Sequence, residues 1–278
     1  MTRNICDEFL RVRHNPFQIF KGSKTPAGLY ARQKWLNESG MAQWQDDFHQ
    51  ALHALMSGQS DDGSWNQSPL ETVRRLFGLH LTIRNQTLEI EKALDWLMRH
   101  TLHHSISSLA EPIAPASDDA FRGMPFIPGQ THVSVISMTL FLATVFQKGH
   151  EPVVLAHYRL LSLWVEQNAG VMDTASDKMN ALRALVVHPD YAEGGATAAL
   201  VNHLEQIREP SGCWPVPIPF FRTVNALAHL HLEQANRQWN RIPAILCRRQ
   251  NSDGSWGGED REWNTFLVVH ALKNKGCL

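Results

Sequence analysis

The stretch RRQNSDGSWGGEDREWNTFLVVHAL, residues 248–272, decides the fold of this chain. Apolar residues recur at helical spacing on both sides of its polar turn, so the pattern predicts two helices joined by a tight connection. A second stretch, LMSGQSDDGSWNQSPLETVRRLFGLHL at residues 55–81, has the same arrangement. Two copies of Q-x-x-x-G-x-W far apart in the chain indicate one helix–turn–helix unit that is used repeatedly.

Degenerate copies of the unit occur between these two stretches. Arg208 takes the place of the glutamine before Trp214, and Gln167 is followed by Asp173 where a tryptophan would fall. Nearly every other long segment has helical periodicity, and no alternating strand pattern with a hairpin signal occurs, so an all-α fold is predicted. We expect a single domain over residues 1–278, with an N-terminal helix at 26–38 and an irregular insert at about 104–129.

Composition and charge limit the classes of function. The balance of 26 basic and 27 acidic residues lacks the footprint of a nucleic-acid-binding protein. The four cysteines show no C-x-x-C spacing, so we expect reduced thiols in a cytoplasmic protein, and the charged N-terminus has no secretory signal pattern. The longest apolar run, residues 133–146, is shorter than the ~18–20 residues of a membrane span. It predicts a buried core helix, and contact with a membrane surface stays open.

The repeated pattern resembles that of a known superfamily. L-x-x-x-Q-x-x-x-G-x-W followed by a helix is similar to the QW repeat of squalene-hopene and oxidosqualene cyclases and to the repeat of protein prenyltransferase β subunits, over roughly residues 40–275. The resemblance implies an α/α toroid, a barrel of about five to six helical hairpins in which the helix before each turn is outer and the helix after it is inner. We interpret Gln59, Trp65, Gln250 and Trp256 as residues that stabilise this fold.

The prenyltransferase branch implies a zinc site built from Asp, Cys and His. This chain has no Asp-x-Cys pair in the right setting, and the cluster of His100, His103 and His104 has no cysteine or acidic partner at ligand spacing. We therefore expect no metal and no cofactor, except Mg²⁺ if the substrate is a diphosphate.

The class II terpene cyclase branch implies an acidic D-x-D-D-T motif at the start of an inner helix, where it protonates an alkene or epoxide. The matching segment is VMDTASDKMNALRAL, with Asp173 and Asp177 about one turn apart. It departs from the motif because the spacing is D-x-x-x-D and Lys178 replaces the threonine. We predict Asp177 as the proton donor or its partner and Asp173 as the other member of the pair. The alternative is a helix cap and a first-turn charge.

Further candidates lie in the insert and on the expected inner helices. Asp118 and Asp119, with Arg122 nearby, either cover a cavity mouth or lie on a solvated loop. Polar and aromatic side chains of the inner helices either line the cavity or belong to ordinary core. The predicted substrate-binding set is Asn180, Asn225, His229, Phe221, Trp263, His270, Asp118 and Asp119, and Phe77, Phe141, Phe220 and Phe266 are further candidates for an aromatic wall.

The resemblance leads to one main functional hypothesis and two alternatives. The main hypothesis is a terpene cyclase-like enzyme that cyclises or isomerises an isoprenoid or similar apolar substrate in the central cavity by acid initiation. The first alternative is a different acid/base reaction run by the inner His and Asn residues. The second is a non-catalytic lipid- or protein-binding toroid, which a cavity filled by side chains would favour. A small apolar substrate is the expected partner, nucleic acid is not expected, and a homo-oligomer stays open.

Overall fold

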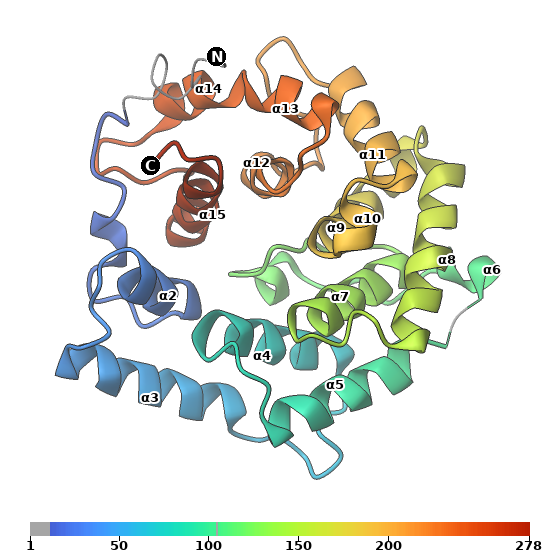
Figure 1. Ribbon diagram of the computed structural model, residues 1–278, viewed down its shortest axis with the longest axis horizontal. Helices are drawn as coiled ribbons and strands as arrows, with labels where there is room; N and C mark the ends of the chain where they lie inside the picture. The colour runs from blue at the N-terminus through green and yellow to red at the C-terminus, as the bar shows by residue number, and fades with distance from the viewer. Residues whose placement is uncertain (1–11, 104) are drawn as a thin grey trace.

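The computed structural model describes residues 12–103 and 105–278, which form two concentric layers of helices (Figure 1). In this part of the chain the inner layer consists of six helices: α2 (Pro26–Lys34), α4 (Pro69–Thr82), α7 (His132–Val145), α9 (Ala175–Val187), α12 (Phe220–Ala228) and α15 (Arg261–Asn274). The outer layer contains α3 (Ala42–Met56), α5 (Leu88–Thr101), α8 (Pro152–Asn168), α11 (Gly195–Gln206), α13 (Glu233–Trp239) and α14 (Ile242–Arg249). Short helical turns are η1 (Gln18–Phe20), α6 (Ile106–Leu109), η2 (Asp118–Phe121), η3 (Met172–Thr174) and α10 (Pro189–Ala192).

The inner layer closes into a ring. Each inner helix packs against the next in chain order, and α15 packs against α2, so the first and last inner helices meet. Gln250 ties this junction, since its side-chain oxygen accepts hydrogen bonds from the Arg13 and His14 N–H groups at 2.9 and 3.1 Å. The fold is therefore the predicted all-α toroid, and the helix before each repeated turn is outer while the helix after it is inner.

The repeated turns share one hydrogen-bonding scheme. Gln59 Nε2 donates to the carbonyl oxygens of Gly63 and Glu89, both at 2.9 Å. Gln250 Nε2 donates in the same way to Gly254 at 3.0 Å and to His14 at 2.8 Å. Each side chain therefore closes its own turn and joins it to a neighbouring segment.

Arg208 performs the same function in the degenerate copy. Its Nε atom donates to the Gly212 carbonyl oxygen at 3.0 Å, and its Nη1 atom donates to that of Gln238 at 3.1 Å. The guanidinium also lies 5.1 Å from the centre of the Trp214 ring. A longer, charged side chain thus supplies the two donors that glutamine supplies elsewhere.

The tryptophans of these turns are core residues. Trp65 and Trp256 are each 1% exposed, and Trp214 is 5% exposed. Each indole N–H donates to a carbonyl oxygen at the end of the preceding helix, at 2.8 to 3.1 Å. Burying about 150–250 Å² of each ring stabilises the fold by roughly 4–6 kcal/mol. The interpretation of these residues as stabilising is confirmed.

The longest apolar run forms α7, an inner helix whose side chains are mostly buried, as expected. Within the described residues, every helix is too short or too polar to span a bilayer.

Two expectations from sequence need correction. The first helix ends at Lys34 rather than at residue 38, because Asn37 adopts a left-handed backbone with φ of 56°. Cys277 is disulfide-bonded, so the expectation of reduced thiols is wrong at this position. Cysteine usage therefore gives no support to a cytoplasmic location. Cys6 and His104 lie outside the described residues.

Candidate functional site

The irregular insert enters one end of the ring and is anchored there. The Met124 carbonyl oxygen accepts hydrogen bonds from Trp263 Nε1 and from Arg222 Nε, both at 3.0 Å. Asn180 holds the next part, because its side chain accepts from the Ile127 N–H at 3.0 Å and donates to the Ile127 carbonyl oxygen at 2.9 Å. These bonds join the insert to the first halves of α9, α12 and α15, so it covers the N-terminal mouth of the ring.

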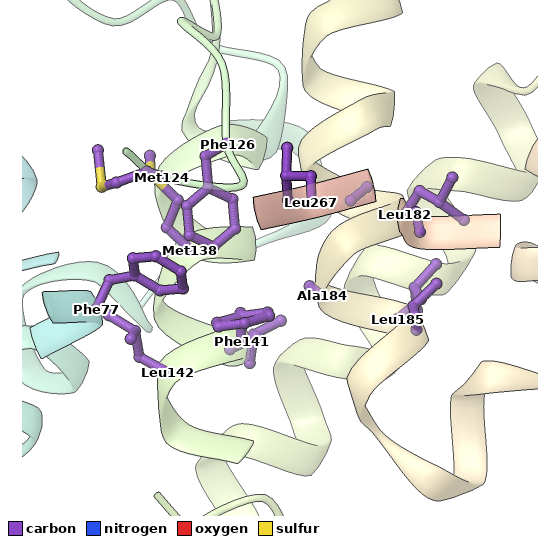
Figure 2. Packing of buried hydrophobic residues seen from close by; sticks show 14 of the residues in the cluster. Phe77, Met124, Phe126, Met138, Phe141, Leu142, Leu182, Ala184, Leu185 and Leu267 are labelled. Carbon is purple, nitrogen blue, oxygen red and sulfur yellow. The ribbon is translucent and has the colours of Figure 1, made fainter. Parts of the chain in front are cut away.

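Aromatic side chains fill the centre of the ring beneath the insert. Phe126 of the insert is fully buried, and its ring centre lies 6.5 Å from that of Phe77 and 5.2 Å from that of Phe141 (Figure 2). Trp263 meets Phe77 edge to face at 5.8 Å and stacks on Phe266 at 5.2 Å. Four of the predicted aromatic residues, Phe77, Phe141, Trp263 and Phe266, therefore lie in the interior, but at this level their rings pack against one another.

Phe220 and Phe221 do not join this aromatic group. Phe220 contacts Trp214 at 5.8 Å, and the Arg249 guanidinium lies 4.8 Å from its ring centre. Phe221 contacts Phe220 at 5.3 Å and is half-buried at the start of α12. These side chains belong to the contact between α12 and its outer neighbours.

A cavity of about 470 Å³ remains beside the filled centre, and we call it the mouth cavity. It lies between the starts of α2 and α15, the middle of α4, the end of α3 and the insert. Its volume is in the range of roughly 300–1,000 Å³ that is usual for small-molecule sites. Apolar walls come from Ala27, Ala51, Ala54, Leu55, Phe77, Leu81, Met124 and Trp263, and charged groups come from Lys24, Arg74, Arg75, Arg122, Asp260 and Glu262.

Asp260 is the acid of this cavity with the fewest partners. It precedes α15 in a left-handed conformation, with φ of 48°, but its side chain makes no capping hydrogen bond to the helix. Its Oδ2 atom accepts one long hydrogen bond of 3.4 Å from the Gly123 N–H. Burial lowers the pKa of the Arg222 guanidinium, and the nearby carboxylates of Asp260 and Asp118 oppose that shift.

Glu262, the other acid of the mouth cavity, is held in place. Its Oε1 atom accepts hydrogen bonds from the Ser23 hydroxyl at 2.9 Å and from the Thr25 hydroxyl. This carboxylate fastens the start of α2 to α15, so its oxygens already serve a structural contact.

A second cavity, of about 570 Å³, lies on the other side of Asp260 and contains the predicted acidic pair. Asp118 and Asp119 of η2 form part of its wall, together with Arg222 and Glu259. Asp119 is exposed and pairs with Arg122 at 2.8 Å. Asp260 lies on the wall of both cavities.

Asp177 is fully buried and caps the start of α7. Its Oδ1 atom accepts from the N–H groups of Gln130 and Thr131 at 3.1 and 3.3 Å and from the Ser134 hydroxyl at 2.6 Å. Its Oδ2 atom accepts from the Thr131 hydroxyl at 3.0 Å. All four groups donate to Asp177, so the carboxyl group serves here as an acceptor. Asp177 lies in the first turn of α9, as the alternative has it, but its oxygens accept bonds from the start of α7, and this geometry does not support a role as proton donor.

Asp173 is exposed in η3, whereas Asp177 is fully buried, so the two carboxyl groups lie in different environments. Lys178, in the place of the family's threonine, is buried and donates to the carbonyl oxygens of Ala169 and Val171. It closes the turn between α8 and α9, which lacks the glutamine and tryptophan of the other units. The two acids therefore do not form a pair.

Three of the predicted polar residues of the inner helices, Asn225, His229 and His270, lie close together toward the opposite end of the ring, whereas Asn180 lies at the insert. His229 and His270 have ring centres 5.1 Å apart, and Asn225 Nδ2 lies 3.5 Å from His270 Nδ1. Burial lowers the pKa of His229 to about 3 and that of His270 to about 4. Both rings are therefore neutral at physiological pH.

One group of described side chains has ligand atoms close enough for a metal ion. The ligand atoms of His150, His188 and Asp190 lie within 4.8 Å of one another. His188 Nε2 is 3.2 Å from the Gly149 carbonyl oxygen, and Nδ1 accepts from the Asp190 N–H at 3.2 Å. Both nitrogens are therefore engaged, and a metal ion would have to displace one of these bonds.

Sequence reasoning did not identify Asp260 or Arg183 as parts of the interior, and of the insert it singled out Asp118, Asp119 and Arg122 but not the segment that enters the ring. Asp260 has a usable signal, since an acid immediately before an inner helix occupies the position that the cyclase motif implies. Arg183 is a cation within the apolar second half of α9, which also marks it as unusual. The insert has no periodicity from which its position could be read.

Comparisons with known proteins agree with the fold. No family model matches the sequence, and no curated protein matches it. A protein from Actinoplanes has a similar structure at 17% identity, with a TM-score of 0.54 over 92% of this chain and 90% of that chain. The type II terpene cyclase MstE from Scytonema, an R337A variant in complex with geranylgeranyl dihydroxybenzoate, is similar at 13% identity, with a TM-score of 0.57 over 92% of this chain and 87% of that chain. The chain therefore has a terpene cyclase-like fold.

Proposed function

We propose that this protein binds an isoprenoid or similar apolar substrate in the mouth cavity and starts its cyclisation or isomerisation by protonating a carbon–carbon double bond. The observation that carries the proposal is the Asp260 carboxyl group, which does not cap its helix and lines the mouth cavity together with the aromatic side chains of Trp263 and Phe77. This proposal assigns the acid to Asp260 instead of Asp177, whose oxygens accept four hydrogen bonds at the start of α7.

The reaction requires an acid, an apolar wall and an aromatic surface. Asp260 transfers its proton to one alkene carbon and leaves a cation on the other. The π electrons of a second double bond in the substrate attack this cation and form the ring bond. A proton lost from the final cation returns to the carboxylate or to water and leaves a new double bond, so no proton is consumed overall and one of the two original double bonds has become the ring bond. Trp263 and Phe77 offer aromatic surface to the cation, and Arg222 stabilises the carboxylate that remains.

The structural comparison supports this reaction class. The cyclase with the similar fold has a substrate with a geranylgeranyl chain, and this chain covers 87% of its length. A protein of this size can therefore be a type II terpene cyclase without a second helical domain.

Blocking the mouth cavity tests the proposal. Ala51 on α3 lines the cavity, and its neighbour Gln50 is exposed and lies outside the lining. We expect geranylgeraniol to raise the melting temperature of the wild type and of Gln50→Trp but not of Ala51→Trp. Equal stabilisation of Ala51→Trp, or no stabilisation of the wild type, would contradict binding in this cavity.

The filled centre favours a second candidate, a non-catalytic lipid-binding toroid. Phe126 closes the axis of the ring against Phe77 and Phe141 and leaves the ligand only the space at the mouth. Stabilisation by geranylgeraniol without any product from it would favour this candidate over the cyclase.

A further inference from the structure

The C-terminal ends of the inner helices enclose a group that we call the inner histidine cluster, His80, His229 and His270. They come from α4, from the residue after α12, and from α15, and all three are partly exposed. His80 contacts Phe141 and Phe146 at 6.3 and 5.9 Å. The cluster thus lies at the end of the ring opposite the insert, where solvent reaches it.

The surroundings of the cluster are cationic. Burial is the largest cause of the low pKa values of the three histidines. The charged groups that lower them further, besides the histidines themselves, are Arg84, Arg183 and Lys275. Among the described residues, neither Arg84 nor Arg183 forms an ion pair with a carboxylate.

Arg183 is the unusual member of this set. It is 5% exposed, and burial lowers its pKa to about 9, so it remains charged at neutral pH. Its Nη1 atom donates to Asn225 Oδ1 and its Nη2 atom to the Arg222 carbonyl oxygen, both at 2.9 Å. Three of its five N–H groups have no acceptor among the described residues. Since both acceptors lie in the first two-thirds of α12, Arg183 does not serve as a cap for a helix C-terminus.

One histidine nitrogen also points to a missing partner, and a second is oriented as a donor. His80 Nδ1 is buried without a hydrogen-bond partner in the described part of the chain. Asn225 Nδ2 lies 3.5 Å from His270 Nδ1, which places the proton of the neutral ring on Nε2 and makes that atom a donor. A buried cation without a carboxylate partner and a buried nitrogen without a hydrogen bond are costly unless a ligand or water satisfies them.

We infer that this end of the ring binds the oxyanion group, a carboxylate or a phosphate, of a small molecule. Arg183 and Arg84 supply the positive charge, and the ring nitrogens of His229 and His270, whose ring centres lie 5.1 Å apart, supply hydrogen bonds, with His80 on the neighbouring α4. An anion there would neutralise the buried Arg183, which has no carboxylate partner among the described residues, while Arg84 is exposed and lies over the Tyr30 ring. The inference does not depend on the isoprenoid reaction, because the mouth cavity and Asp260 lie at the other end of the inner helices.

The test is isothermal titration calorimetry of the full chain at low ionic strength with inorganic phosphate, diphosphate and benzoate. We expect saturable binding of at least one anion to the wild type. The anion that binds most tightly shows whether the site prefers a phosphate or a carboxylate group. His270→Gln should weaken that binding about tenfold, as expected for the loss of one hydrogen bond to a charged group. His231→Gln, which alters an exposed histidine just beyond the cluster, should leave it unchanged.

Arg183 also holds α9 to α12, so a second measurement avoids its substitution. In proton NMR spectra of the wild type, the ring signals of His229 and His270 should shift as the anion is added, whereas that of His231 should not. Binding of none of the three anions, equal affinity of wild type and His270→Gln, or shifts confined to exposed histidines would overturn the inference. None of these outcomes bears on cyclisation of an uncharged polyprene.

Discussion

Replacement of Asp177 by alanine tests whether this carboxyl group stabilises the fold. The backbone N–H groups of Gln130 and Thr131 lose their acceptor, which costs about 0.5–2 kcal/mol in comparable helix caps. The hydroxyl groups of Thr131 and Ser134 lose theirs too, at about 0.5–1.5 kcal/mol each. We therefore expect Asp177→Ala to lower the free energy of unfolding by about 3 kcal/mol.

Asp173→Ala is the matched control, because Asp173 is an exposed acid four residues earlier. An exposed substitution of this kind should change the free energy of unfolding by less than about 0.5 kcal/mol. Urea denaturation followed by circular dichroism measures both values. For Asp177→Ala a loss of about 3 kcal/mol corresponds to a melting temperature lower by roughly 6–12 °C. If Asp177→Ala is no less stable than Asp173→Ala, the capping role is wrong.

Three further predictions concern the turns, the centre and an ion-pair network. Gly63→Ala should destabilise the fold by more than about 2 kcal/mol, because φ is 98° and a Cβ atom would lie 2.4 Å from the Lys92 carbonyl oxygen. Gly58→Ala should cost only about 1 kcal/mol, because φ is also positive but no atom lies within 4 Å of the added Cβ atom. Equal losses of stability for the two variants in urea denaturation would contradict this prediction. Phe126→Ala should cost about 3–5 kcal/mol by opening a cavity in the centre, and a loss below about 1 kcal/mol would show that the insert does not pack there. Asp47 accepts hydrogen bonds from Arg32 and Lys24, which lower its pKa from 3.8 to about 2. Because the pKa is lower in the folded state than in the unfolded state, the ionised Asp47 stabilises the fold above about pH 4. The difference in the free energy of unfolding between wild type and Asp47→Asn should therefore vanish as the pH falls toward 2. A difference that does not change with pH, or one equal to that of the exposed Asp46→Asn, would refute this prediction.

The repeated unit was predictable because its residues act locally. Gln59 and Gln250 reach a carbonyl oxygen four residues ahead, and the indole groups of Trp65 and Trp256 reach the end of the helix before the turn. Such contacts depend on spacing, which the sequence states directly. Recognition of the repeat then implied the ring and the order of inner and outer helices.

The interior was less predictable because it depends on segments far apart in the chain. Asp177 follows the expected pattern for an acid at an inner-helix start, but the Thr131 and Ser134 hydroxyls that occupy it come from another unit. Asn180 is engaged by the insert, whose irregular backbone carries no periodic signal. Asp260 resembles an ordinary helix cap until the structure shows that its carboxyl group makes no capping bond.

The most direct test of the proposed function is product formation from uncharged polyprenes, followed by gas chromatography and mass spectrometry. Wild type, Asp260→Asn and Asp177→Asn would be incubated with geranylgeraniol and squalene below the melting temperature of the least stable variant. We predict a cyclised or isomerised product from the wild type and from Asp177→Asn, and none from Asp260→Asn. Formation of the same product by Asp260→Asn, or loss of the product in Asp177→Asn alone, would contradict the assignment of Asp260 as the acid. If none of the three proteins forms a product, the proposed reaction on these substrates is contradicted.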